Sequence, residues 1–161
     1  MGHRPDRTDQ ILLGPGGRDV RFLRLLLDTA VLGEVCHPRK YGDVRGWLAR
    51  VVVHLEILIS EVADYELRRE LLRIESHHSL ARLDEPTREL SYVPMATSTW
   101  RAAAKPWATL RRGGVTAAPT ALDGDVLIAA QAIAEGATVV TPNVRHFEPI
   151  VPALTWRAVT L

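Results

Sequence analysis

The chain has 161 residues, of which 47% are hydrophobic, which is enough to form one domain with a substantial core. Its 20 Lys and Arg side chains nearly balance 19 Asp and Glu side chains, so no overall charge indicates a nucleic-acid partner, and such a partner would have to bind a local patch. The single cysteine, Cys36, excludes an internal disulfide and a cysteine-cluster metal site, which favours a reducing, cytoplasmic location.

The first 19 residues are polar and rich in Gly and Pro, and they predict a flexible extension ahead of one domain spanning residues 20–161. The apolar run 11–13 in this extension is too short to be the core of a signal peptide. No apolar run elsewhere reaches the roughly 20 residues that a membrane-spanning helix needs. We therefore expect no membrane segment.

The domain begins with a strand, a helix and a second strand. The almost wholly apolar run 22–27 predicts a buried parallel strand that ends at Asp28. A loop then leads to residues 43–54, where apolar side chains recur at helical spacing, and residues 55–59 predict the next strand.

The middle of the chain is mainly helical. Ser60 is suited to N-cap a helix from residue 61 to about 77, and acidic residues in its first turn suit the helix dipole. A second helical stretch starts near residue 79 and runs up to Pro86 or past it, after which residues 92–95 predict a short strand.

The last third continues the alternation. Residues 97–112 predict a helix that Pro106 should kink or split, and residues 121–135 are apolar almost all round, as in a buried helix. Residues 137–141 predict a strand, and residues 154–161 a final short one. Strands that alternate with helices indicate an α/β fold, a three-layer α/β/α sandwich with a mainly parallel central sheet.

Polar side chains near the ends of the predicted strands are the first candidates for a site, because ligands bind beyond the carboxyl ends of parallel strands. The candidates are Asp28, Glu61, Asp64, Glu66, Asp123, Asp125 and Asn143. Mg²⁺ and Mn²⁺ prefer such oxygen ligands, and a bound ion lowers the pKa of an attacking water. Converging carboxylates would repel one another without a cation, so the pattern predicts a divalent metal site for phosphodiester hydrolysis.

Each candidate also has a purely structural explanation. Asp28 would equally well begin a turn, and Asn143 is a common turn former. Acids in the first turn of a helix, such as Glu61, are common because of the helix dipole. Glu66 lies too far into its helix for capping and would otherwise pair with Arg69 or with an arginine one turn further on.

Four segments, taken together and in this order, resemble the PIN domain, a metal-dependent ribonuclease fold that includes the VapC toxins of bacterial toxin–antitoxin pairs. The segments are LLLDTAVL (25–32), ISEVADYELRREL (59–71), DGDVLIAA (123–130) and VVTPNVRHF (139–147). The resemblance extends over residues 21–156, nearly the whole chain after the extension.

The resemblance implies roles for single residues. Metal would be held by Asp28, Glu66 and Asp125, and Asn143 would complete the catalytic set. Thr29 would position the first acid, while Glu61 and Asp123 are auxiliary candidates. Two positions depart from the family: Ala30 stands where asparagine is usual, and Asn143 brings no charge. A second metal site would therefore be weak or depend on substrate.

The resemblance thus implies an endoribonuclease dependent on Mg²⁺ or Mn²⁺ that acts as a toxin with an antitoxin partner and forms a homodimer. The alternative is a weak or inactive PIN-like domain that binds RNA or protein. A phosphatase with Asp28 as nucleophile is disfavoured, because such enzymes usually carry a second aspartate where Ala30 stands.

Substrate contacts are less clear from the sequence. Lys105, Arg111 and Arg112 offer a basic patch for phosphates, although a solvated helix end explains them equally well. Trp100 and Trp107 are seven residues apart and share a helix face, a spacing more typical of core or dimer packing than of base stacking.

Overall fold

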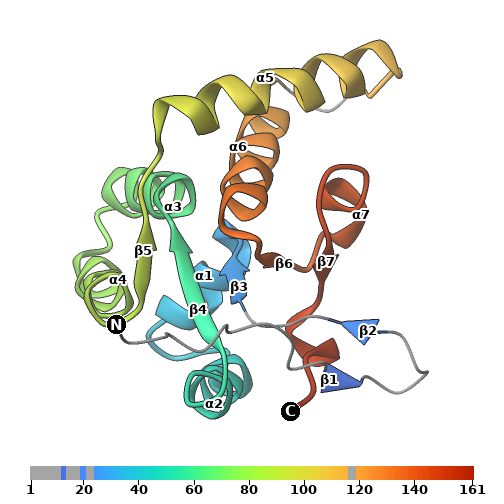
Figure 1. Ribbon diagram of the computed structural model, residues 1–161. Coiled ribbons are helices and arrows are strands. Elements are labelled where there is room, and N and C mark those ends of the chain that lie inside the picture. The colour runs from blue at the N-terminus through green and yellow to red at the C-terminus, as the bar shows by residue number, and fades with distance from the viewer. Residues whose placement is uncertain (1–11, 14–18, 21–23, 116–118) are drawn as a thin grey trace, which may run out of the picture.

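The computed structural model describes residues 12–13, 19–20, 24–115 and 119–161 (Figure 1). A five-stranded sheet, in which every neighbouring pair is parallel, forms its centre, with the strand order β5-β4-β3-β6-β7. The strands are β3 (Arg24–Leu27), β4 (Glu56–Ser60), β5 (Ser91–Val93), β6 (Thr138–Val140) and β7 (Ala153–Leu154). This architecture confirms the predicted α/β class and parallel sheet.

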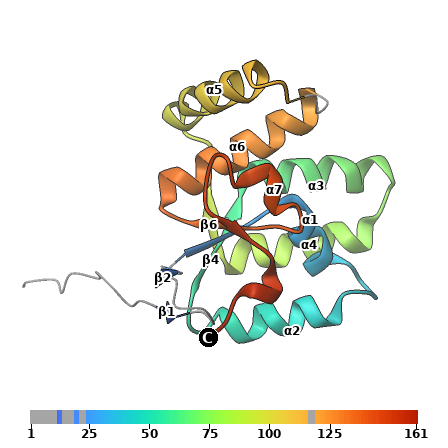
Figure 2. The same cartoon turned by 90° about the vertical axis from the view of Figure 1, so that its right-hand side faces the viewer.

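Seven helices lie around this sheet in the described residues. They are α1 (Thr29–Cys36), α2 (Gly42–Val51), α3 (Glu61–Arg73), α4 (His77–Glu89), α5 (Thr97–Arg112), α6 (Pro119–Glu135) and α7 (Val144–Phe147). Helices α1, α3 and α4 contact one another, and α5 packs on α6 (Figures 1 and 2). A 3-10 turn, Trp156–Ala158, follows β7.

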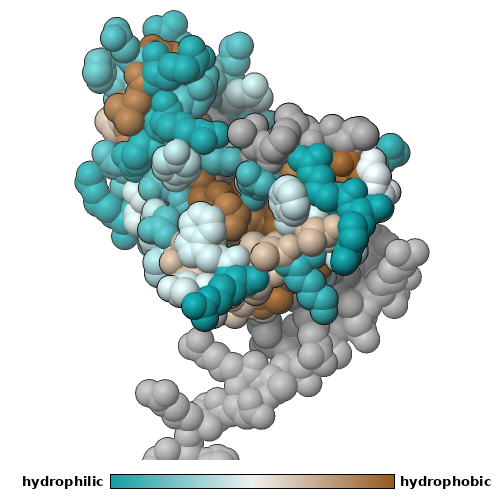
Figure 3. Space-filling view, turned by 90° about the horizontal axis from the view of Figure 1, so that it is seen from above, coloured by the Kyte–Doolittle hydropathy of each residue, from teal (hydrophilic) through white to brown (hydrophobic). Residues whose placement is uncertain are grey.

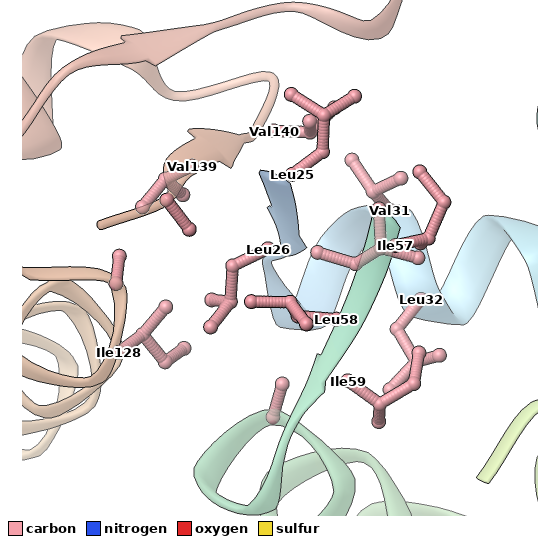
Figure 4. Packing of buried hydrophobic residues seen from close by; sticks show 14 of the residues in the cluster. Leu25, Leu26, Val31, Leu32, Ile57, Leu58, Ile59, Ile128, Val139 and Val140 are labelled. Carbon is pink, nitrogen blue, oxygen red and sulfur yellow. The ribbon is translucent and has the colours of Figure 1, made fainter. Parts of the chain in front are cut away.

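The central strand β3 is buried on both faces. Leu25, Leu26 and Leu27 are fully buried, which explains why the strand is a continuous apolar run and does not alternate with polar residues. Leu26 lies on the side of the sheet where Ile128 of α6 packs, and Ile57 of β4 lies on the side of α1 (Figure 4). Each such side chain contributes roughly 1.5–3 kcal/mol through burial.

Helix α1 was missed by the sequence analysis, which expected a loop after Asp28. Its sequence contains several β-branched residues and Gly33, which have low helix propensity. The helix nevertheless forms because Asp28 caps its first turn and four of its side chains are buried: Val31, Leu32, Val35 and Cys36. Tertiary packing outweighs propensity here.

Two features of the helices differ from the predictions: α5 is not split at Pro106, and α6 is not buried all round. Pro106 neither splits nor ends α5, which runs from Thr97 to Arg112. The carbonyl that Pro106 deprives of a partner belongs to Ala102, an exposed residue, so water can solvate it. Helix α6 is not buried all round, since Ile133 is 55% exposed.

The other elements lie close to their predicted places. Ser60 caps α3 as expected, since its hydroxyl oxygen accepts the N–H of Ala63 at 3.1 Å. Residues 61–77 and the following stretch divide into α3 and α4, and α4 continues past Pro86. The last strand is shorter than predicted.

Only two short segments of the predicted N-terminal extension are described: Leu12–Leu13 (β1) and Asp19–Val20 (β2), which pair antiparallel. The extension and its boundary at residue 19 therefore stay predictions. Among the described helices, none combines the length and the apolar character needed to cross a bilayer.

Candidate active site

Asp28 lies where β3 ends and α1 begins, and it is only 5% exposed. Its backbone N–H donates to the carbonyl of Val140 at 3.0 Å, which joins it to β6. Its carboxylate accepts two hydrogen bonds: from the N–H of Thr29 to Oδ1 at 2.6 Å and from the hydroxyl of Thr141 to Oδ2 at 2.8 Å. The carboxylate is therefore held in place from two strand ends.

Burial raises the pKa of Asp28 to about 6, because removal from water disfavours the charged form. The two hydrogen bonds oppose this shift, and the negative charges of Asp125 and Glu66 add to it. The hydrogen bond from Thr29 to Glu66 and the contact of Glu66 with Gly124 bring the three acids close together, since Thr29 adjoins Asp28 and Gly124 adjoins Asp125. Residues 28, 66 and 125 thus meet at one end of the sheet.

Glu66 reaches this end from the second turn of α3. The hydroxyl of Thr29 donates to its Oε2 at 2.6 Å. Its Oε1 lies against the backbone of Gly124, so closely that a Cβ at position 124 would overlap it. A side chain at position 124 would therefore displace the end of Glu66 from its place beside Asp125.

Asp125 belongs to the part of α6 that faces the same site and is partly buried. Burial raises the pKa of Asp125 above its ordinary value, and Glu66 adds to this, while His146 lowers it. The Nδ1 atom of His146 lies 3.1 Å from Asp125 Oδ2. His146, in α7, therefore orients the third acid.

The auxiliary acids bind structural partners. Glu61 accepts the backbone N–H of Met95, and Asp123 accepts the indole N–H of Trp107 at 2.7 Å. A metal-binding role for either stays a prediction. The structural alternative for Glu66 was an ion pair with an arginine of its own helix. Within the described residues, the side chain of Glu66 instead accepts a hydrogen bond from Thr29.

The PIN domain model matches residues 25–148, which is more than half of the chain. This chain belongs to the PIN domain family.

Solved structures with this fold include VapBC2 from Rickettsia felis bound to a promoter DNA fragment, with a TM-score of 0.70 and 21% identity, and DNA-bound VapBC from Salmonella typhimurium, with 0.68 and 23%. A third is VapBC-1 from nontypeable Haemophilus influenzae, with 0.65 and 20%. Each likeness covers 83% of this chain and 98% of the other, and at these identities it shows the fold alone. No curated protein matches the chain.

Asn143, the fourth predicted catalytic residue of this PIN domain, is exposed, and its backbone N–H donates to the hydroxyl of Thr141 at 3.0 Å. No contact between its side chain and the three acids is described, so a catalytic role for its amide stays a prediction. Thr141 and Gly124 were not predicted as site residues, and the contact of His146 with Asp125 was not predicted either. Thr141 had one signal, a hydroxyl directly after a buried strand.

The donor atoms of this site fit Mg²⁺ or Mn²⁺, because carboxylate oxygens are the hard ligands that these ions prefer. In the parts of the chain that the structure describes, no group of three or more His, Cys, Asp or Glu side chains is placed so that it could hold a metal ion. Each of the three acids instead has its own donor, Thr141, Thr29 or His146. Mg²⁺ is commonly bound by one or two carboxylates and several waters, so a complete protein cage is not required.

Proposed function

We propose that this PIN domain is a metal-dependent endoribonuclease that hydrolyses RNA phosphodiester bonds. The observation that carries the proposal is the burial of Asp28 next to two further acids, which raises its pKa to about 6. A buried carboxylate among like charges is unfavourable unless a cation compensates it. Metal-dependent hydrolysis of a phosphodiester would explain why three acids lie together, and the PIN domain family is a family of nucleases.

Asp28, Glu66 and Asp125 would hold the Mg²⁺ or Mn²⁺ ion. When bound, this ion neutralises charge on the phosphoryl oxygens and lowers the pKa of the attacking water. The protein's own contribution is to orient the ligands. Thr141 holds Asp28, Thr29 holds Glu66 through its hydroxyl, and His146 holds Asp125. Such oriented neighbours commonly increase metal affinity or activity 10- to 100-fold.

The direct test is cleavage of a mixed RNA pool by the purified chain with Mn²⁺ or Mg²⁺, compared with a chelator. We expect defined fragments only with metal, and we expect Asp28→Asn and Asp125→Asn each to reduce the rate at least 100-fold while circular dichroism stays unchanged. A matched control is Asp43→Asn, since Asp43 is exposed and pairs only with Arg157 among its described ion pairs. Equal rates in all four proteins would refute the proposal.

The biological setting we propose is that of a toxin with an antitoxin partner. Support comes from the solved structures of similar fold, which are VapBC complexes. If the product of the adjacent gene is an antitoxin, it should copurify with this chain and suppress its cleavage of RNA. A homodimer is part of the same proposal, and light scattering at micromolar concentration measures it.

A second candidate function is binding of RNA or protein without cleavage. The observation that favours it is Asn143, which supplies no charge and whose side chain is exposed. In that case wild type and the Asp28→Asn variant would be equally inert towards RNA, yet both would bind the ligand. If Asn143→Asp then produces cleavage in the presence of Mn²⁺, the missing charge is the cause.

A further inference from the structure

Helix α5 carries a concentration of positive charge that the proposed chemistry does not use. It contains four cations, Arg101, Lys105, Arg111 and Arg112, and no acidic residue, whereas the whole chain has a net charge of only +1. None of the four pairs with a carboxylate within the described residues. Arg111 is held by the carbonyl of Val115 and lies over the Trp107 ring, so three cations remain free to bind a partner.

These three cations share one side of the helix. Arg101, Lys105 and Arg112 are spaced at i, i+4 and i+11, which places them in one row. The buried residues of α5, Thr99 and Ala103, lie on the other side. Because α5 packs on α6 at the outer edge of the molecule (Figures 1 and 2), this row faces solvent.

Two tryptophans form a neighbouring row on the same helix. Trp100 is 54% and Trp107 is 37% exposed, so neither is a core residue. The indole N–H of Trp107 donates to Asp123, two residues before the proposed metal ligand Asp125. The aromatic row therefore extends toward the site of the three acids.

A cavity of about 710 Å³ lies between Trp100 and Glu66, one of the three acids. Among its lining residues are Trp100 from α5, Tyr65 and Glu66 from α3, and Gly124 from α6. Tyr65 is 60% exposed, and the guanidinium of Arg69 lies 5.2 Å from its ring centre. Seen from above, hydrophobic surface lies in the middle of this face with hydrophilic side chains around it (Figure 3).

We propose that α5 is a track for single-stranded RNA, on which Arg101, Lys105 and Arg112 bind phosphates and Trp100 stacks on an unpaired base beside the cavity. This inference rests on the proposed function, because the ribonuclease activity is the reason for taking RNA as the ligand. A cationic row beside exposed aromatic rings suits a strand with charged phosphates and flat bases, and stacking does not require a particular sequence.

A second copy of the chain fits this row less well. In a two-fold symmetric dimer the same patch meets itself, so a dimer centred on this row would bring its cations against the same cations of the partner. No acidic residue of α5 could compensate them. Charge complementarity therefore favours a polyanion.

The test measures binding separately from cleavage. All proteins carry Asp125→Asn, and a fluorescein-labelled oligouridylate of 12 nucleotides is titrated with Mg²⁺ present, its integrity checked on a gel. We expect the triple change Arg101→Gln, Lys105→Gln and Arg112→Gln to weaken binding on the order of tenfold and to reduce the slope of log affinity against log salt by about 2. Trp100→Ala should weaken binding about tenfold, and Trp100→Phe less.

The matched control is the triple change Arg39→Gln, Lys40→Gln and Arg50→Gln. Like the α5 change, it removes two arginines and one lysine. These three side chains are exposed and lie in α2 and the preceding loop, at the opposite end of the molecule in Figure 1. We expect binding close to that of the parent protein. Equal weakening by both triple changes would show nonspecific attraction and overturn the inference.

Further outcomes separate this inference from the proposed function. If wild type cleaves RNA but the α5 variants bind RNA as the parent does, the proposed RNA-binding role of α5 is wrong and the proposed nuclease function is supported. If the α5 variants lose RNA binding and wild type does not cleave RNA, the RNA-binding role of α5 is supported and the nuclease function is refuted. Absence of RNA binding by the parent, or a change of oligomeric mass in the α5 variants with unchanged RNA binding, overturns the track.

Discussion

The carboxyl group of Asp28 is buried at the end of β3, where its pKa rises from an ordinary value of 3.8 to about 6. Between these two values the folded protein binds more protons at this residue than the unfolded chain does. The free energy of unfolding therefore falls as pH rises through this window, and the whole loss is present above about pH 6. Metal binding by Asp28, as proposed, would therefore require a charge that the fold disfavours.

We predict that, with a chelator present, Asp28→Asn makes the protein more stable than wild type at pH 7, by roughly 3 kcal/mol, since a shift of about two pKa units corresponds to about that energy. The advantage should disappear near pH 4, where Asp28 is protonated. Urea unfolding at both pH values measures it. An effect of Asp28→Asn that does not change with pH would contradict the predicted titration.

A second residue-scale prediction concerns Gly124. Gly124→Ala should reduce metal-dependent activity at least tenfold, because the new Cβ overlaps Glu66 Oε1 and displaces that carboxylate. Gly46→Ala is the control, since its Cβ would meet only the flexible end of Arg50 at 3.4 Å. Alanine in a helix normally stabilises it by up to about 1 kcal/mol relative to glycine. Unchanged Mn²⁺ affinity by calorimetry in Gly124→Ala would contradict the predicted displacement of Glu66 from the metal site.

At the scale of elements, helix α3 determines where Glu66 lies, and its N-cap residue, Ser60 at the end of β4, is anchored from two sides. The hydroxyl of Ser60 accepts the N–H of Ala63 and donates to Oε1 of Gln131, a fully buried residue of α6. The amide of Gln131 in turn donates to the carbonyl of Val93 in β5 at 2.7 Å. One small network thus joins two helices and two strands.

We predict that Ser60→Ala lowers the free energy of unfolding by about 2–3 kcal/mol, because it removes a helix cap and leaves a buried acceptor without its donor. Ser76→Ala is the comparison: Ser76 stands at the same position of α4, but its side chain caps no backbone N–H. Its replacement should cost less than 1 kcal/mol. Equal losses in denaturant unfolding would mean that Gln131 finds another donor.

At the scale of the whole molecule, the site exists only in the folded state. Residues 28, 66 and 125 come from β3, α3 and α6, and the hydrogen bond between Thr29 and Glu66 spans 37 positions. The unfolded chain cannot hold these carboxylates together, so a bound divalent ion would stabilise the fold by mass action.

We therefore predict that Mn²⁺ raises Tm by several degrees, since a ligand at 100 times its Kd contributes about 2.7 kcal/mol. Glu66→Gln should lose most of this increase. Glu70→Gln, on the same helix but exposed and paired with Arg73, should keep it. Differential scanning calorimetry measures both, and identical shifts in the two variants would place the ion elsewhere.

The main features of the fold follow from local patterns. The strands, the cap at Ser60 and the bounds of α5 could be predicted because apolar periodicity and capping depend on near neighbours. Helix α1 could not, because its stability comes from side chains buried against distant segments and not from its own propensity. The exposure of Trp100 and Trp107 could not be predicted either. Their spacing shows that they share a helix face but not whether another segment packs on that face.

By itself, the sequence determined the class of fold, the order of the five sheet strands and of the longer helices, and the segments that supply the candidate acids. Only the tertiary structure decided that Thr141 holds Asp28 across 113 positions, that Gly124 accommodates Glu66, and that His146 orients Asp125. The physical reason is that strand and helix signals arise between residues close in the chain. Hydrogen bonds and electrostatic shifts at the site instead depend on distances that exist only after the sheet has assembled.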